Sequence, residues 1–403
     1  MSTSISHTGS DGSHDIICFS HLRWNFVFQR PQHLLTRCGR GRRVFFFEEP
    51  VFDSEGPRLM VTRDPSDVMV AVPHLPAGLQ PDAIASELSS LVDGLIAGEQ
   101  ITSYIAWYYT PMALAFSSHL EPAAVVYDCM DELSGFAGAP PGLEQAERAL
   151  LAVADVVFTG GQSLYESKRS LHGNIHAFPS SVDSAHFARA RRQRPDPVDQ
   201  AAIGRPRVGF FGVLDERLDV ELVSGAAAAR PDWHFVLIGP VVKVDPERLP
   251  KAVNIHYLGP KSYGELPDYI AGWDVAWLPF ARNASTRFIS PTKTPEYLAA
   301  GRPVVSTSIR DVVRPYGELG LARIADTADQ AVAAVASALA EPSAARQSAA
   351  DAFMAGMSWD ATWARMWDLI EEALERNRRA HARQHESHRS GPAAAAGGPA
   401  VTA

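Results

Sequence analysis

The sequence has few cysteines, no excess of positive charge and no long hydrophobic run. Its three cysteines show no CxxC spacing and no pairing with histidine, so we expect buried thiols in a reducing compartment rather than metal ligands or disulfides. The 37 basic against 46 acidic residues give a net charge of −9, which argues against a nucleic-acid-binding protein. No apolar run reaches the ~18 residues of a membrane span. The polar N-terminus lacks the apolar segment of a signal peptide. We therefore expect a cytoplasmic protein with at most peripheral contact at the inner face of the plasma membrane.

Several catalytic signatures are also absent. The sequence has no GxGxxG followed by an acidic residue, which is the fingerprint of nicotinamide binding. It contains no P-loop, no GxSxG turn and no HExxH motif. The common nucleotide hydrolases, serine hydrolases and zinc proteases are therefore disfavoured.

A length of 403 residues predicts two domains. Continuous apolar segments alternate with helical stretches such as 81–97 and 143–152, and a helix is expected to open at Pro31. This alternation indicates an α/β fold with parallel sheets. The expected strands of the first domain are 15–20, 44–47, 68–72, 104–107, 124–127 and 156–159, and those of the second are 207–211, 233–238, 255–258, 275–279 and 303–307.

The domain boundaries follow from changes in composition. Residues 14–187 form the first expected domain, and the Arg-, Pro- and Asp-rich segment 188–204 reads as a linker. Residues 205–357 form the second domain. Each domain should bind ligands at the carboxyl ends of its strands.

The two ends of the chain are expected to differ from the domains. Residues 1–13 and 377–403 are predicted to be disordered. Residues 358–376 predict a helix with Trp359, Trp363 and Trp367 on one face, which packs either onto the first domain or into the second domain's own core.

The segment 290–305 carries the strongest functional signal. A helix start with a hydroxyl, a cation and a carboxylate suits a nucleoside diphosphate, because backbone N–H groups and the helix dipole attract phosphates. Ser290, Thr292 and Lys293 would face the phosphates, and Glu296 could accept two ribose hydroxyls. We expect Thr294 to cap this helix and Pro295 to take its first position.

Other second-domain turns indicate the same site. Gly212 follows a strand and allows close approach of a ligand to the backbone. Arg217, expected in the first turn of the next helix, could grip an anion or pair with Asp215 or Asp219.

Three further positions have two readings each. The turns at Gly239 and Gly259 could present amides to a nucleobase or could be ordinary strand exits. Arg287 adds positive potential near the same loop, or is simply solvated.

In the first domain, the loop after the first strand is rich in arginine and aromatic residues. Arg23 and Arg30 could hold an anionic acceptor, and Trp24 could stack on a sugar ring. The cluster of Arg37, Arg40, Arg42 and Arg43 is expected to be solvated rather than bound to an anionic bilayer.

Acidic residues follow the strand 124–127. Asp131 and Asp128 are candidates for a general base, which needs a carboxylate aimed into a cleft, and His21 is a third candidate. The alternative is that these acids cap the next segment or are solvated.

The layout and these motifs together resemble the bacterial GT-B glycosyltransferases that use nucleotide-sugar donors, in particular the teichuronic-acid-type group. The resemblance covers about residues 15–374 and rests on segments 24–34, 127–132, 215–219 and 290–293. It implies two Rossmann-like domains facing a cleft, with the donor on the second and the acceptor on the first, and a last helix that crosses back to the first domain.

The resemblance also implies roles for residues. Arg217 and Lys293 would contact the donor diphosphate, and Glu296 the ribose, with no metal and no cofactor besides the nucleotide-sugar substrate, for which a UDP-sugar is the first choice. The acceptor would be a glycan or a lipid-linked molecule in cell-surface polysaccharide synthesis. A nucleotide-sugar-binding module without turnover and a sugar epimerase are the alternatives.

The chain departs from the retaining members of this group at Phe288, where many carry a glutamate. The stereochemical outcome is therefore open between inversion, with Asp131 or Asp128 as base, and retention, with the leaving phosphate as base.

Overall fold

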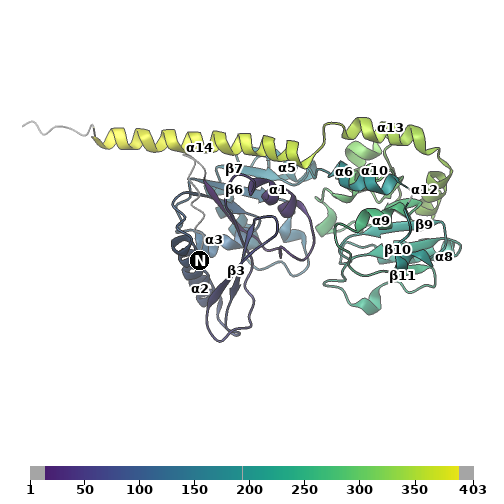
Figure 1. Ribbon diagram of the computed structural model, residues 1–403, viewed down its shortest axis with the longest axis horizontal. Coiled ribbons are helices and arrows are strands. Elements are labelled where there is room, and N and C mark those ends of the chain that lie inside the picture. The colour runs from purple at the N-terminus through teal and green to yellow at the C-terminus, as the bar shows by residue number, and fades with distance from the viewer. Residues whose placement is uncertain (1–13, 193, 390–403) are drawn as a thin grey trace, which may run out of the picture.

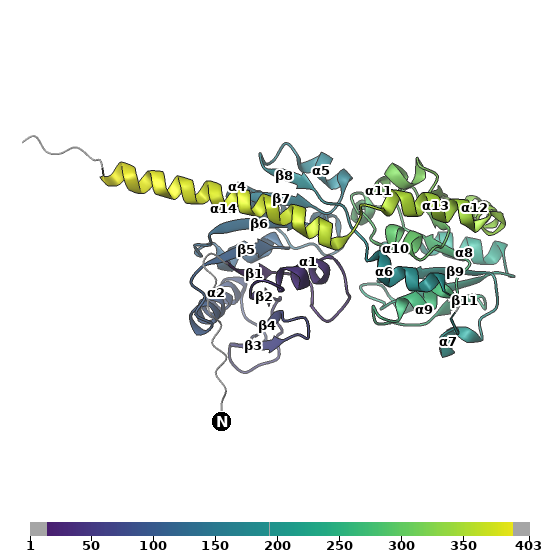
Figure 2. The same cartoon turned by 45° about the horizontal axis from the view of Figure 1, so that its top comes forward.

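The computed structural model describes residues 14–192 and 194–389. They form two α/β domains side by side, and the C-terminal helix runs back along the first domain (Figures 1 and 2). The disorder expected for residues 1–13, and for the tail from residue 390 onward, concerns positions outside the described residues. No described helix is long and apolar enough to cross a membrane.

The first domain is built on an eight-stranded sheet with the order β3-β4-β2-β1-β5-β6-β7-β8. The strands are parallel except for β3, which pairs antiparallel with β4. Their bounds are β1 (Asp15–Phe19), β2 (Val44–Phe47), β3 (Arg58–Arg63), β4 (Met69–His74), β5 (Tyr104–Tyr108), β6 (Ala124–Cys129), β7 (Val156–Thr159) and β8 (Ile175–Ala177). The apolar runs that predicted six of these strands are buried on both sheet faces, as a parallel sheet requires.

Helices cover both faces of this sheet. On one face α1 (Arg30–Cys38) and α14 (Trp359–Arg389) share an apolar core with the strands. On the other face the core includes α2 (Pro81–Gly98), α4 (Leu143–Val153) and α5 (Gln162–Lys168), with the short α3 (Leu114–Ser117) packed against it. The three cysteines are free and buried, as expected.

The second domain contains a six-stranded parallel sheet with the order β11-β10-β9-β12-β13-β14. Its strands are β9 (Arg207–Phe211), β10 (His234–Ile238), β11 (Ile255–Tyr257), β12 (Val275–Leu278), β13 (Val304–Ser306) and β14 (Ala322–Ile324). Its helices are α6 (Ser184–Phe187), α7 (Val198–Ala201), α8 (Val220–Ala229), α9 (Leu266–Ala271), α10 (Lys293–Ala299), α11 (Arg310–Val312), α12 (Ala328–Ala340) and α13 (Ser343–Met354). Both sheets are thus mainly parallel and helix-covered, which agrees with the predicted fold class.

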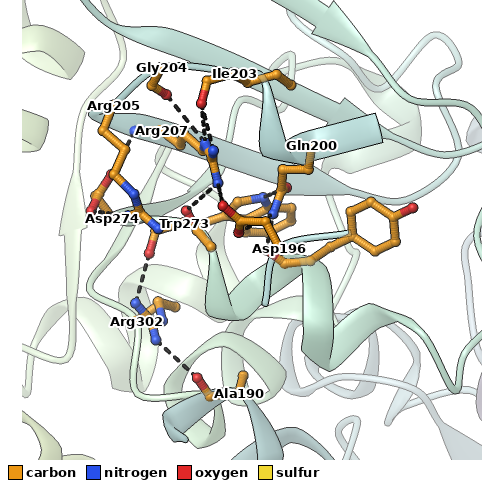
Figure 3. Close-up of polar contacts among 12 residues, drawn as sticks. Ala190, Asp196, Gln200, Ile203, Gly204, Arg205, Arg207, Trp273, Asp274 and Arg302 are labelled. Carbon is orange, nitrogen blue, oxygen red and sulfur yellow. Dashed lines mark hydrogen bonds and ion pairs between the residues drawn. The ribbon is translucent and has the colours of Figure 1, made fainter. Parts of the chain in front are cut away.

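Helix α6, within the residues expected to belong to the first domain, and the segment 188–204, expected to be a linker, both pack onto the second domain (Figure 3). The buried Arg207 guanidinium donates to the Ile203 carbonyl and pairs with Asp196 at 2.8 Å. Arg302 donates to the Ala190 carbonyl at 3.1 Å. Two charges of the segment have distant partners that the sequence did not reveal: Arg191 pairs with Asp351 and Arg194 with Asp268.

The C-terminal helix α14 is longer than expected, since it continues through residues 377–389. It crosses to the first domain and buries Trp359 and Met366 there, which decides between the two readings of the tryptophan face. Part of the basic cluster expected to be solvated holds this helix in place. Arg37 and Arg40 each bind Asp360 at 3.0 Å, and the guanidinium of Arg42 lies 3.4 Å from the Trp367 ring centroid, while Arg43 pairs with Asp15.

Ile370 of α14 is fully buried in the core that this helix shares with the first domain, and its replacement tests the packing. Ile370→Ala should lower the free energy of unfolding of the first domain by about 2–5 kcal/mol, because it leaves a cavity. Urea denaturation followed by circular dichroism measures the change. Glu372→Ala, at an exposed position of the same helix, is the control, and equal stability of the two variants would contradict the docking of α14.

Candidate active site

Two adjoining cavities lie between the domains, at the carboxyl ends of both sheets. The first, of about 130 Å³, is lined by first-domain loops after β1, β6, β7 and β8 and by second-domain loops after β9 and β12 and the start of α10. The second, of about 60 Å³, shares Val27, Phe28, Gly212 and Lys293 with the first. This is where parallel sheets are expected to bind ligands.

Two glycine turns form the second-domain wall. Gly212 follows β9 with φ +154° and Gly239 follows β10 with φ +145°. A Cβ at Gly239 would lie 1.8 Å from the Gly212 carbonyl oxygen, so only glycine fits. The Gly239 N–H donates to the Gly259 carbonyl at 2.9 Å. Gly259 therefore supports the wall, and it does not line either cavity.

Arg217 lies in the loop before α8, not in the first helical turn as expected, because Asp219 caps that helix. Asp215 holds the guanidinium through Nε at 2.9 Å and Nη2 at 2.6 Å. Burial alone would lower the pKa of Arg217, but its hydrogen bonds with Asp215 outweigh this effect and raise it. The pairing with Asp215 positions the side chain at the first cavity, so the two readings of Arg217 are compatible.

Helix α10 begins at Lys293, with Thr292 at its N-cap position. The expected cap was Thr294, so the helix begins two residues earlier than predicted. Pro295 is consequently the third helical residue. It is tolerated there because the first N–H groups of a helix have no intrahelical partner. The N–H groups on either side of Pro295 are bonded back into the turn: Thr294 donates to the Pro291 carbonyl and Glu296 to the Thr292 carbonyl, each at 3.3 Å.

Lys293 reaches both cavities. Its Nζ donates to Thr292 Oγ1 at 2.8 Å and lies 3.9 Å from Glu296 Oε2. Burial and the nearby charge of Arg217 lower the pKa of Lys293, while Glu296 opposes this shift. Lys293 and Arg217 line the same cavity, each with a carboxylate beside it, and a cavity wall that carries two cations suits an anion.

Glu296 faces the second cavity with an unsatisfied oxygen. The side chain is 5% exposed, and its Oε2 has no hydrogen-bond partner among the described residues. Burial raises the pKa of Glu296 to about 7, although Lys293 opposes the shift. An unpartnered buried carboxylate oxygen is costly unless a ligand hydroxyl donates to it.

Asp131 faces the first cavity from the other domain. Burial raises its pKa to about 6, and the positive charges of Arg217 and Arg30 oppose the rise. A carboxylate with a pKa near neutrality at a cavity wall has the properties of a general base.

Asp128 and Arg30 form a buried ion pair. Asp128 was a candidate general base, and Arg30 was expected to bind an anionic acceptor. Asp128 is fully buried in β6, and both of its carboxylate oxygens accept from Nε of Arg30 at 3.0 Å. The Nη2 atom of Arg30 lies 2.9 Å from Asp128 Oδ1. Arg30 also donates to the Phe178 carbonyl at 2.8 Å. Arg30 borders the first cavity, but its donors point into the domain, so both expectations were wrong.

The remaining acceptor-side candidates are also structural. Trp24 is 5% exposed and packs edge-on against Phe46, so it offers no ring to a sugar. Arg23 binds Glu48 at 2.9 Å and two carbonyls of the next loop. His21 lines neither cavity, and burial lowers its pKa to about 4.

The comparisons with known proteins agree with this geometry. Residues 205–341 match the family model described as glycosyl transferases group 1. A Bacillus subtilis (strain 168) protein, TuaH, named as a glycosyltransferase for teichuronic acid biosynthesis, is 28% identical over 240 residues, which are 55% of this chain and 60% of that protein. The chain thus spans about three fifths of the length of this curated relative.

Solved structures resemble the chain over most of its length. They include a sucrose-phosphate synthase of Thermosynechococcus elongatus (TM-score 0.65, 15% identity, 90% of this chain and 100% of that one). Another is HepE of Anabaena in complex with UDP and glucose (TM-score 0.61, 14% identity, 88% and 99%). A trehalose-6-phosphate protein of E. coli, bound with UDP-2-fluoro glucose, has a TM-score of 0.64 at 13% identity (89% and 99%). The chain has the GT-B fold.

Arg287, an expected donor contact, and Phe288, where the chain departs from the retaining pattern, both lie outside the lining of the two cavities. Arg287 is exposed, lies over the Phe288 ring and does not line either cavity. Phe288 packs against first-domain core residues, so this position supplies a domain contact and no carboxylate.

Sequence reasoning missed the apolar contacts that bring the two GT-B domains together. Phe28 stacks on Tyr263 with ring centroids 4.4 Å apart, and both line the second cavity. Ser180 donates to the Ser290 carbonyl at 3.1 Å across the cleft. The available signal was the pair of exposed phenylalanines after β1, Phe26 and Phe28, whereas the expected sugar-stacking role concerned Trp24 alone.

Gly239→Ala should abolish binding of UDP-sugars, because its Cβ displaces the Gly212 turn. Calorimetric titration with a UDP-sugar measures the effect. Gly94→Ala is the control, since nothing lies within 4 Å of a Cβ in that exposed helical position. Normal binding by Gly239→Ala would show that the two turns are not part of the site.

Asp128→Asn should lower the free energy of unfolding by about 3–5 kcal/mol, because it leaves Arg30 buried without a counter-charge. Asp131→Asn should be at least as stable as the wild type at pH 7, since burial disfavours the charged carboxylate. Urea denaturation of both variants separates the two roles. The assignment fails if Asp131→Asn is the more damaging change.

Proposed function

We propose that the protein is a glycosyltransferase that moves a sugar from a nucleoside-diphosphate sugar, with a UDP-sugar as first choice, to an acceptor in cell-surface polysaccharide synthesis. One observation carries the proposal: Arg217 and Lys293 of the second domain share a cavity with Asp131 of the first. The similarity to TuaH, and the UDP and UDP-2-fluoro glucose bound to HepE and to the E. coli protein, support the substrate class.

The donor would lie across the two cavities. Its diphosphate would bind Arg217 and Lys293, with the hydroxyl of Thr292 beside them. The ribose hydroxyls would donate to Glu296, and the base would lie along the Gly239 turn in the second cavity. The two fixed cations supply the charge that stabilises a departing diphosphate, so we infer a metal-independent hexosyltransferase.

The sugar would be transferred from the diphosphate oxygen to an acceptor hydroxyl. In the inverting route, the acceptor hydroxyl gives its proton to Asp131 as its oxygen bonds to the anomeric carbon and the diphosphate leaves. In the retaining route, the leaving phosphate takes that proton and Asp131 only orients the acceptor. The stereochemistry of the product decides between the two routes.

Arg217→Ala and Lys293→Ala should each weaken UDP-sugar binding at least about tenfold, since each removes a charge-assisted hydrogen bond worth roughly 1.5–3 kcal/mol. Calorimetry or thermal stabilisation across UDP-, GDP-, ADP- and dTDP-sugars measures the loss and identifies the preferred base. Arg287→Ala should bind normally, because this cation lies outside both cavities. Unchanged affinity in both test variants would contradict the donor site.

The affinity for a UDP-sugar should rise by up to about tenfold from pH 6 to pH 8. Ribose hydroxyls donate to the ionised form of Glu296, whose pKa of about 7 leaves the side chain mostly protonated at pH 6. Titrations at several pH values measure this slope. Glu296→Gln should bind weakly and lose the rise, and a variant that keeps the rise would assign it to another group.

The two alternatives differ in their products. A binding module would hold the nucleotide sugar without releasing UDP in the presence of any acceptor. An epimerase would change the sugar while it remains attached to the nucleotide. Chromatography of donor and product after incubation with acceptor pools separates these cases from transfer.

A further inference from the structure

A third cavity, of about 410 Å³, lies within the first domain and shares no lining residue with the two between the domains. Its walls are mostly aromatic and aliphatic side chains from the ends of β1 and β2, the segment after β5 and the start of α2. The principal ones are Phe19, Phe47, Phe52, Ile84, Leu88 and Phe116. Its volume is in the usual range for small-molecule sites.

The cavity lies on the same edge of the sheet as Asp131. Phe19 and Phe47 end β1 and β2, and Asp131 follows the end of β6, only two strands from β1 in the same parallel sheet. Helix α2 follows β4, so its first turn also begins at this carboxyl edge. A ligand in the cavity could therefore extend along the edge toward the cleft.

The polar groups of the cavity are already engaged. Ser20 Oγ accepts from the Leu22 N–H, and Thr110 Oγ1 accepts from the Met112 N–H. Among the described lining residues the charged ones are Glu48, which is bound by Arg23, and Glu49. The cavity thus offers no cation to a phosphate and few hydrogen-bonding groups to a peptide or a sugar.

The apolar wall is open to the surroundings. Phe52 is 46% exposed, and Ile84 and Phe116 are half-buried. Covering such a surface with an apolar group is favourable in proportion to the area removed from water.

We propose that this cavity receives the hydrocarbon chain of a lipid-linked acceptor, whose polar end extends along the sheet edge to Asp131. The inference rests on the proposed function and decides between the two acceptor classes that the sequence left open. The apolar lining, the lack of a cation and the position on the acceptor side of the cleft together favour a neutral chain over a soluble glycan.

The test uses the full chain with farnesol, a neutral isoprenoid alcohol, displacing the fluorescent probe 1-aminoanthracene. Ala85→Trp fills the cavity from α2, and Phe52→Ser removes an exposed part of its wall without touching the core. Leu319→Trp, at a 58% exposed position of the second domain, is the matched control. Stabilisation by a UDP-sugar is measured on the same samples.

Farnesol should bind the wild type and Leu319→Trp, and should bind Ala85→Trp and Phe52→Ser at least about tenfold more weakly. The UDP-sugar should stabilise all four proteins equally. The inference is overturned if farnesol does not displace the probe from the wild type, or binds both test variants normally. Loss of UDP-sugar stabilisation in the wild type, with farnesol binding intact, would instead overturn the proposed function and leave the apolar site standing.

Discussion

Two positive charges held close together in a half-buried space govern this structure. Arg217 is fixed by Asp215 and Lys293 by Thr292 and Glu296, so neither side chain can move fully into water. Each cation has a carboxylate beside it, Asp215 for Arg217 and Glu296 for Lys293, and burial raises the pKa of Glu296 to about 7. For the diphosphate of the proposed donor, these two cations are in position before the ligand arrives, and such preorganisation lowers the cost of binding.

Two neighbouring aspartates of the first domain have different surroundings. Asp128 and Asp131 are three positions apart, yet one is locked to Arg30 inside the sheet and the other faces the cavity. The buried pair ties β6 to the start of α1, and through the Phe178 carbonyl to the segment after β8. Arg30 directly follows the loop that carries Phe28, and Asp128 lies just before the loop that carries Asp131. The ion pair therefore anchors both loops.

The sequence predicted the parallel strands well because their apolar runs are continuous and buried on both faces. It missed β3, whose residues are mostly exposed on the edge of the sheet, and it missed β8 and β14, which have three residues each. The sequence analysis placed the start of α10 too late. The first four N–H groups of a helix have no intrahelical partner, so proline is tolerated at the third position as well as at the first.

The sequence placed Gly212, Arg217, Lys293 and Glu296 in one site because they follow strand ends or begin a helix, and in the structure all four line the two cavities. The acceptor side was not predictable, because distant partners decide the fate of its residues. Arg30 meets Asp128 98 positions away, and Arg23 meets Glu48 25 positions away. Trp24 is withdrawn into the core by the hydrophobic effect. Loop composition indicated a functional surface, but only the packed structure distinguishes a side chain that faces the cleft from one that supports it.

The most direct test of the central claim is a crystal structure of the protein with UDP bound. Phosphate oxygens should lie within hydrogen-bond distance of both Arg217 and Lys293, with the ribose hydroxyls on Glu296. A complex in which the diphosphate lies outside the interdomain cavity, while Arg217 remains bonded only to Asp215, would contradict the account.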